Sequence, residues 1–384
     1  MATKIKGITW DHPRGYQPLR AVAAEWGRKA GIQLQWDVRT LKEFGDMPVE
    51  VLVDRYDLII IDHPYMGEAA SKALLLPLED HLPQSFLDVQ AAQSVGPSYD
   101  SYGWKGRHYA LPVDAAAQVA VMRADLADAI GWGPPVYTEQ LRAAAEQLPT
   151  GKFIAIPLCP TDIWCVFLTL CAQYNGGEFF TPAGIEEPAG RYALAQLQEW
   201  ATFLHPNSFR MNPIQMLDRM AAEDEIVYCP FSFGYTNYAR KDAAGIRLVF
   251  MDAPRRSGHG ISTLLGGAGI AVSRNSANRN ACMDFIRYVL DPEVQRTTYY
   301  INGGQPAHLS AWEDPACNAD SGDFFGQTLY TLQHAYRRKG APGFNRFQEA
   351  AADIVHVSAM EGMDGALMMR QLNNLFQAIC HDQL

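Results

Sequence analysis

Apolar and polar residues along the chain alternate between two kinds of segment. Short runs rich in β-branched residues, such as KIKGITW at 4–10 and YDLIII at 56–61, predict buried strands. Between them, PLRAVAAEWGRKAG at 18–31 places its apolar residues at helical spacing. Strands that alternate with amphipathic helices are typical of a largely parallel sheet covered by helices. The first part of the chain therefore predicts an α/β lobe.

A second series of the same kind begins near Thr138, which is a suitable N-cap for the helix-like EQLRAAAEQL at 139–148. From 277 onward the pattern is mainly helical, apart from the loop INGGQPAHLS at 301–310. We therefore expect a second α/β lobe with a helical C-terminal part. Its other expected segments are helices at 162–174 and 186–205 and strands at 152–158, 225–230, 246–254 and 264–273.

Composition narrows the function classes. The 384 residues are 48% hydrophobic and 19% charged, which is enough for two or more cores. Lys plus Arg number 32 against 42 for Asp plus Glu, so the formal charge is -10, and a nucleic-acid partner is not expected. The longest apolar helical stretch, at 163–172, is shorter than the roughly 20 residues of a membrane span.

The cysteines predict buried thiols. Their number is odd, none forms C-x-x-C, and most lie in apolar segments, so we expect neither a disulfide framework nor a zinc site. Such usage favours a reducing compartment. The seven are Cys159, Cys165, Cys171, Cys229, Cys282, Cys317 and Cys380.

Two apolar runs end in the same tripeptide. Asp-His-Pro follows the first strand in TWDHPRG at 9–15 and the buried strand in LIIIDHP at 58–64. Ligands of parallel α/β sheets bind where strands end, and Asp, His and Arg offer hydrogen-bonding groups there. The alternative is that Asp and Pro serve as turn formers, although turn chemistry does not require His twice. We interpret the following residues as ligand-binding: Trp10, Asp11, His12, Arg14, Asp62 and His63.

A metal or catalytic site is the second interpretation of these residues, because two His and two carboxylates can bind a metal. However, no H-E-x-x-H, no G-x-S-x-G and no cysteine in a catalytic context accompanies them. We expect no metal, no cofactor and no catalytic residue. The Gly-rich stretch at 266–273 leads into a strand instead of opening a helix, so it does not match the dinucleotide fingerprint. It favours a close backbone approach or a hinge.

Several aromatic residues stand beside polar, Gly or Pro residues. Aromatic faces cover the C–H faces of sugar rings, while carboxylates and guanidinium groups bind hydroxyls. Each ring could also belong to a core. The candidates are Trp10, Trp164, Phe231, Phe233, Tyr235 and Tyr300.

Separated segments of the chain resemble one family in their order and spacing. Gly106–Pro112 is similar to the motif G-K-x-Y-A-L-P, and the segments 56–82, 99–126, 136–149, 226–238, 264–273 and 301–307 complete the likeness. Together they resemble the type 1 extracellular solute-binding proteins of ABC importers, in the sugar-binding group. The resemblance covers nearly the entire chain.

This resemblance implies a two-lobed, periplasmic-binding-protein-like fold of type II. Each lobe would be a mixed or parallel sheet flanked by helices, with the solute held in a cleft that closes about a hinge. Lobe 1 would span 1–112 plus 268–308, and lobe 2 would span 113–267 plus 309–384. The chain would cross the hinge about three times, near Pro112–Asp114, Gly266–Gly269 and Gln305–His308. Further cleft residues by likeness of position are Asp114, Gln118, Trp164, Phe231, Tyr235, Gly267, Gln305 and Arg337.

The function that the resemblance implies is binding of a carbohydrate or sugar derivative for an ABC permease, by a periplasmic monomer. The start of the chain shows neither a leader nor a lipobox cysteine, so a cytoplasmic location is the alternative. Two other functions stay open: an enzyme that uses the Asp-His pairs as acid and base, and a sensor subunit without transport. The residues leave open whether the solute is acidic or neutral.

Overall fold

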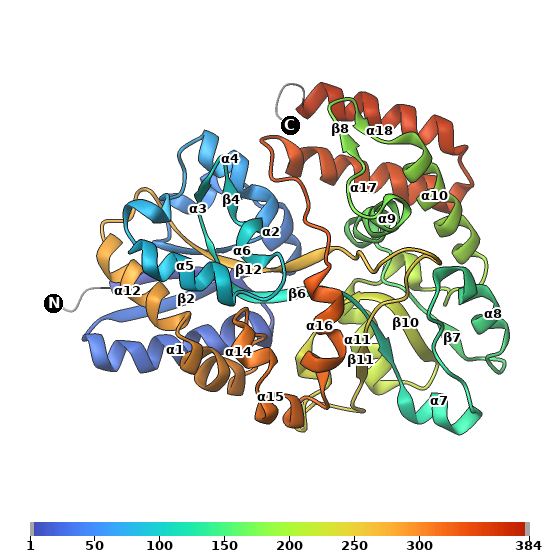
Figure 1. Ribbon diagram of the computed structural model, residues 1–384, viewed down its shortest axis with the longest axis horizontal. Coiled ribbons are helices and arrows are strands. Elements are labelled where there is room, and N and C mark those ends of the chain that lie inside the picture. Colours follow the sequence, from blue (N-terminus) through green and yellow to red (C-terminus); the bar gives the residue numbers. More distant parts are fainter. Residues whose placement is uncertain (1–3, 381–384) are drawn as a thin grey trace. The chain divides into compact units, whose positions relative to one another are not determined.

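The computed structural model describes residues 4–380, apart from the side chain of Asp46, and the chain falls into two compact units (Figure 1). Unit 1 contains residues up to 116, 266–319 and 338–345. Unit 2 contains 117–265, 320–337 and the residues from 346 on. The expected mixed α/β class with two units is confirmed, but the predicted boundaries differ. Unit 1 continues beyond 308 and regains the segment 338–345, so the chain passes between the units at 116/117, 265/266, 319/320, 337/338 and 345/346.

The sheet of unit 1 is mixed. Its strand order is β2-β1-β3-β12. β1 runs parallel to β2 and β3, with Gly7 opposite Leu58, whereas β12 runs antiparallel to β3. The four strands are β1 (Lys4–Trp10), β2 (Gln33–Arg39), β3 (Leu58–Ile61) and β12 (Leu265–Val272).

Helices cover both faces of this sheet, and β3 shows why its sequence is apolar throughout. Leu58 and Ile60 belong to a core with α1 (Pro13–Ala30) and α12 (Arg279–Val289), while Ile59 and Ile61 belong to a core with α3 (Glu50–Val53) and α4 (Met66–Ser71). Successive side chains of a strand point to opposite faces, so a strand buried on both sides needs no polar alternation.

The other elements of unit 1 are short. They are α2 (Leu41–Asp46), α5 (Gln84–Gln93), α6 (Ser98–Ser101), α13 (Pro292–Val294), α14 (Leu309–Trp312) and α15 (Pro315–Asp320), the last reaching the unit boundary, with the hairpin β4 (Gly103–Trp104) and β5 (Arg107–His108). Single turns of 3₁₀ helix form at His63–Tyr65 and Leu78–Asp80, and a π-helical turn forms at Gln295–Tyr299.

Unit 2 is also built on a mixed sheet. β6 (Leu111–Met122) passes into it from unit 1 and pairs antiparallel with β10 (Ile226–Phe233) and β11 (Val249–Met251). β10 pairs parallel with β7 (Phe153–Ile154). Its remaining elements are α7 (Ala124–Ile130), α8 (Leu141–Glu146), α9 (Pro160–Asn175), α10 (Glu187–Ala201), α11 (Pro213–Ala222), α16 (Phe324–Gln333), α17 (Phe344–Glu361), whose first two residues belong to unit 1, α18 (Gly365–Cys380), the hairpin β8 (Phe180–Thr181) and β9 (Gly184–Ile185), and 3₁₀ turns at Thr138–Gln140, Ser208–Arg210 and Thr236–Tyr238.

Helix α9 is the apolar helix predicted at 162–174. It packs against α10, and nearly all of its side chains are buried, which explains why its sequence lacks a polar face. In the part of the chain that the structure describes, no helix has the length and apolarity to span a membrane. All seven cysteines are free thiols; Cys159 is partly exposed and the others are buried, as predicted.

Candidate functional site

The first Asp-His-Pro loop joins β1 to α1. His12 is the N-cap of α1, and its Nδ1 accepts a hydrogen bond from the Arg14 backbone N–H at 3.1 Å. Burial, and then the positive charge of Arg14, lower the pKa of His12 to about 4. The imidazole is therefore neutral near pH 7, and because Nδ1 accepts, the ring proton is on Nε2. Asp11, the residue before it, is exposed.

Arg14 turns from this loop toward β6. Its Nε and Nη2 donate to the two carboxylate oxygens of Asp114 at 2.8 and 2.6 Å, and both side chains are almost completely buried. A two-pronged contact of this kind is the strongest arrangement available to an Arg and a carboxylate. Burial raises the pKa of Asp114, and the adjacent guanidinium opposes that rise.

The second Asp-His-Pro loop follows β3. Asp62 caps the 3₁₀ turn, since its Oδ1 accepts from the His63 backbone N–H at 2.8 Å. Its Oδ2 accepts from Arg338 Nη2 at 2.6 Å. Burial alone would raise the pKa of Asp62, but the charges of Arg338 and His63 hold it well below its usual range. The His63 ring is buried and lies edge-on to Tyr102.

The two loops leave the sheet of unit 1 at the same edge. β1 and β3 are parallel neighbours, with Gly7 opposite Leu58 and Ile8 opposite Ile59, and each loop follows the carboxyl end of its strand. The topology therefore brings together two segments that are about fifty residues apart, as the sheet argument required.

Trp10 and Gly267 have distinct environments in unit 1. Trp10 packs against Phe44, and a Cβ at Gly15 would lie 2.5 Å from its ring. Its indole Nε1 is buried and has no hydrogen-bond partner among the described residues. Gly267 has φ of +98°, and a Cβ there would lie 2.5 Å from the Asp114 backbone oxygen. The Gly-rich stretch therefore permits a close approach of two backbone segments.

Two of the predicted amide side chains bind protein groups. Gln305 Nε2 donates to the backbone oxygen of Ala115 at 2.7 Å and so ties its loop to β6 in unit 1. In unit 2, Gln118 Oε1 accepts from the Thr169 hydroxyl at 2.5 Å, and that hydroxyl accepts from the Leu264 N–H. These contacts link elements of the fold, which is a structural role that the sequence did not indicate.

Three aromatic candidates of unit 2 are buried, namely Phe231, Tyr235 and Trp164, and they differ in whether a polar atom lacks a hydrogen-bond partner. Phe231 is fully buried and stacks on Trp200 with ring centroids 6.0 Å apart, so its ring lies among core residues. Tyr235 is also buried. Trp164 stacks on Phe167, but its Nε1 is buried without a partner in residues 4–380.

The two adjacent arginines, Arg337 and Arg338, have different environments. Arg337 is exposed and belongs to unit 2, whereas Arg338 is buried and pairs with Asp62 in unit 1. The double Arg was the only available signal.

Asp162 is a buried carboxyl that the sequence did not single out. It lies in the first turn of α9, two residues before Trp164, and Cys159 Sγ donates to its Oδ2 at 3.0 Å. Burial raises the pKa of Asp162 to about 7. An acidic residue in a first helical turn is common, so nothing in the sequence distinguished this one.

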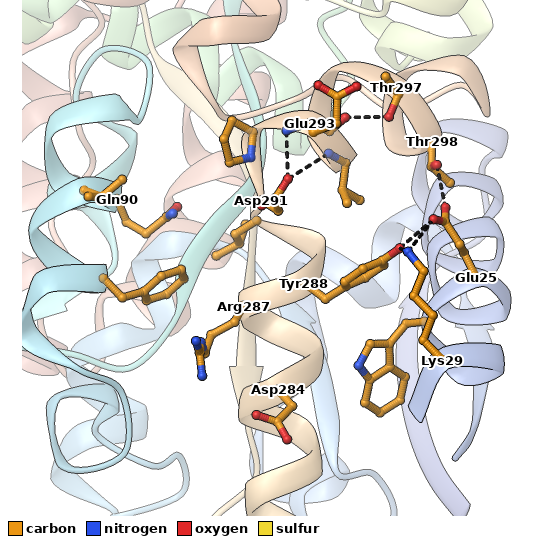
Figure 2. A pocket seen from close by; sticks show the side chains of 16 residues that line it. Glu25, Lys29, Gln90, Asp284, Arg287, Tyr288, Asp291, Glu293, Thr297 and Thr298 are labelled. Atoms are coloured by element: carbon orange, nitrogen blue, oxygen red, sulfur yellow. Dashed lines mark hydrogen bonds and ion pairs between the residues drawn. The ribbon is translucent and has the colours of Figure 1, made fainter. Parts of the chain in front are cut away.

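A groove of about 660 Å³ on unit 1 lies outside the predicted residues. Figure 2 shows its polar side chains bonded to one another: Glu25 accepts from the Tyr288 and Thr298 hydroxyls at 2.6 and 2.7 Å. Lys29 Nζ donates to the Tyr288 hydroxyl at 2.8 Å. These bonds link α1 to α12 and to the π-helical turn, so we assign this network to the fold and place the candidate site at the strand ends.

Comparison with known proteins decides the family. The profile described as bacterial extracellular solute-binding protein matches residues 53–324, which include the second Asp-His-Pro loop and most of unit 2. The chain belongs to this family. Its members are extracellular proteins by description, and the predicted resemblance is confirmed.

Solved structures share the fold of this solute-binding protein. An ABC transporter solute-binding protein of Agrobacterium radiobacter K84 in complex with ribitol has a TM-score of 0.81 at 17% identity, covering 97% of both chains. One of Thermotoga lettingae bound with α-D-tagatose has a TM-score of 0.83 at 17% identity, covering 99% of this chain and 100% of the other. UgpB of Mycobacterium tuberculosis in complex with glycerophosphocholine has a TM-score of 0.79 at 16% identity, covering 99% of this chain and 98% of the other. At these identities the likeness establishes the fold.

Proposed function

We propose that this protein binds a carbohydrate or another polyhydroxylated solute outside the cytoplasm and delivers it to the transmembrane subunits of an ABC importer. The observation that carries the proposal is the convergence of the two Asp-His-Pro loops at one sheet edge in a member of a solute-binding family. Similar folds hold ribitol and α-D-tagatose, which are both rich in hydroxyl groups.

The indole groups support a hydroxylated ligand. A buried N–H without a partner costs roughly 1–3 kcal/mol, and the oxygen of a bound hydroxyl would remove that penalty. Trp10 in unit 1 and Trp164 in unit 2 each present such a group. The ring face of a Trp also suits the C–H face of a sugar.

Binding without turnover fits these groups better than catalysis. A general base works best with a pKa near the working pH, whereas the pKa of His12 is about 4 and its Nδ1 is occupied in capping α1. The structural neighbours are also binding proteins by name. Chromatography of the ligand after prolonged incubation should recover it intact. A product that forms with the wild type and not with His12→Ala would support the enzyme instead.

A ligand screen tests the proposal directly. Thermal unfolding is measured with ribitol, tagatose, maltose and other sugars at saturating concentration, with amino acids and short peptides as the comparison set. A ligand at 100 times its Kd adds about 2.7 kcal/mol to the free energy of unfolding, which raises the midpoint clearly. A shift only with amino acids or peptides, or with no solute at all, contradicts the proposal. The hinge closure that the resemblance implies stays a prediction, which small-angle scattering with the best ligand would check.

A further inference from the structure

Two arginines lie at the strand ends of unit 1, in a polar cluster with Asp62 and Asp114, and both already have carboxylate partners. Arg14 binds the two oxygens of Asp114 at 2.6 and 2.8 Å, and Arg338 binds Asp62 at 2.6 Å. All four side chains are largely buried: those of Arg14 and Asp114 are 4% and 1% exposed, and those of Arg338 and Asp62 are 8% and 14% exposed. The four groups therefore sum to zero charge as two contacting pairs.

This pairing determines which solutes the cluster can accept. A guanidinium without a carboxylate is a ready receptor for a carboxylate or phosphate, since its fork of donors matches their oxygens. Here an anionic solute would have to displace Asp62 or Asp114, or place its charge beside carboxylates that are already ionised. Separating a buried pair leaves an uncompensated charge, which is strongly unfavourable. Uncharged hydroxyl groups meet no such obstacle.

Of the other groups in the two loops, His63 also contacts Asp62, with its Nδ1 3.1 Å from Asp62 Oδ1. The pKa of His12 lies at about 4, so its imidazole is neutral at pH 7. Asp11, which precedes it, is an exposed carboxylate. The pKa of Asp62 is held well below its usual range, so this carboxylate stays ionised at every pH at which sugar binding would be measured.

We propose that the site selects uncharged polyhydroxylated solutes against their carboxylated and phosphorylated derivatives, and that Asp62 sets this selectivity by keeping Arg338 paired. The inference rests on the proposed function, since it concerns the same site. It is not implied by the fold alone, because a similar fold holds glycerophosphocholine, whose phosphodiester is anionic.

The experiment compares matched solutes by isothermal titration calorimetry. For the sugar or polyol that binds best, its sugar acid and its phosphate ester are titrated into the wild type and Asp62→Asn. We expect the wild type to bind the uncharged solute at least tenfold more tightly than either derivative. Asp62→Asn should reduce that ratio at least tenfold, because it removes the carboxylate that pairs with Arg338 and that an anionic solute would have to displace. Asp88→Asn makes the same charge change at an exposed position of α5 and should leave the ratio unchanged.

Two further measurements keep the inference falsifiable. Arg338→Gln removes the cation instead, so it should increase the preference for the uncharged solute, and it replaces Asp62→Asn if that variant does not fold. Tighter binding of an anionic derivative by the wild type, or an unchanged ratio in both variants, overturns the inference while the proposed function stands. Failure of every sugar, polyol and derivative to bind instead overturns the proposed function, and this inference with it.

Discussion

Asp62 and Arg338 are 276 residues apart in the sequence, yet Asp62 Oδ2 and Arg338 Nη2 lie 2.6 Å apart. The contact attaches the returning segment 338–345 to the end of β3. A second bond does the same, since the Gly67 N–H donates to the Gly340 backbone oxygen at 2.7 Å. The polar cluster of unit 1 thus depends on a segment that reaches it only after the chain has passed through unit 2.

A side chain at Gly67 should disrupt this attachment. A Cβ there would lie 2.0 Å from the Gly340 oxygen, which is backbone and can yield only if the segment moves. We expect Gly67→Ala to reduce the free energy of unfolding by about 1–3 kcal/mol, measured by urea denaturation. The control is Gly133→Ala, where a Cβ meets nothing within 4 Å. Equal stability of the two variants would contradict the close contact.

Removing one partner of the Arg14–Asp114 pair should reduce the free energy of unfolding far more than replacing both partners with apolar residues. Asp114→Ala leaves a buried guanidinium without its carboxylate, so we expect a loss of about 3–5 kcal/mol in the free energy of unfolding. The double variant Arg14→Met with Asp114→Leu removes both charges and should recover most of that loss. A double variant as unstable as Asp114→Ala would show that the damage comes from packing instead of charge.

Trp10 should contribute a hydrogen bond to the ligand. Trp10→Phe keeps an aromatic ring but removes the buried N–H, and we expect a decrease in affinity of up to about tenfold, the value of one hydrogen bond. Trp36→Phe is the matched control, because Trp36 Nε1 is also buried without a partner among the described residues, whereas Trp36 lies in the middle of β2, opposite Gly7, and not beside either Asp-His-Pro loop. Titration calorimetry with the best ligand distinguishes the two. A greater effect at Trp36 would count against the site.

The low pKa of His12 predicts acid sensitivity. The folded state holds this pKa at about 4, below its ordinary value of 6.5, so the unfolded chain takes up a proton first as the pH falls. The corresponding stability is complete above pH 6.5 and is lost between pH 6.5 and about 4. His12→Asn keeps a capping acceptor and should flatten this dependence in thermal melts. His12→Ala should also lose about 1 kcal/mol at pH 7. Parallel pH profiles for wild type and His12→Asn would refute the assignment.

In contrast to His12, Asp162 has a raised pKa, which predicts that its contribution to stability falls as the pH rises. Its folded pKa of about 7 exceeds the ordinary 3.8, so the folded state retains the proton and loses stability relative to the unfolded chain as the pH rises from about 4 to 7. Asp162→Asn should equal the wild type near pH 4 and exceed it at pH 8 by at most about 4 kcal/mol. Asp353→Asn, at an exposed position of α17, should show no such pH-dependent difference in melting temperature. A constant difference between Asp162→Asn and wild type across pH would rule out this titration.

Local patterns in the sequence determined the elements and where two of them end. The strand predicted at 4–10 is observed at Lys4–Trp10, and the helix predicted at 162–174 is observed at Pro160–Asn175. The sequence placed each Asp-His-Pro loop at the end of a strand, and the parallel pairing of β1 with β3 then puts both loops at one sheet edge. Period and turn chemistry are properties of neighbouring residues, so one sequence suffices to find them.

Only the tertiary structure decided which partner each polar group has. Residue spacing did not show that Asp62 pairs with Arg338, or that the amide of Gln118 binds Thr169. It also did not show that Phe231 faces the core. Hydrogen bonds and ion pairs form between groups that the chain path brings within about 3 Å, and spacing along the sequence does not determine that path. The sequence pattern thus identifies the polar side chains near the strand ends, and the tertiary structure determines which hydrogen bonds and ion pairs they form.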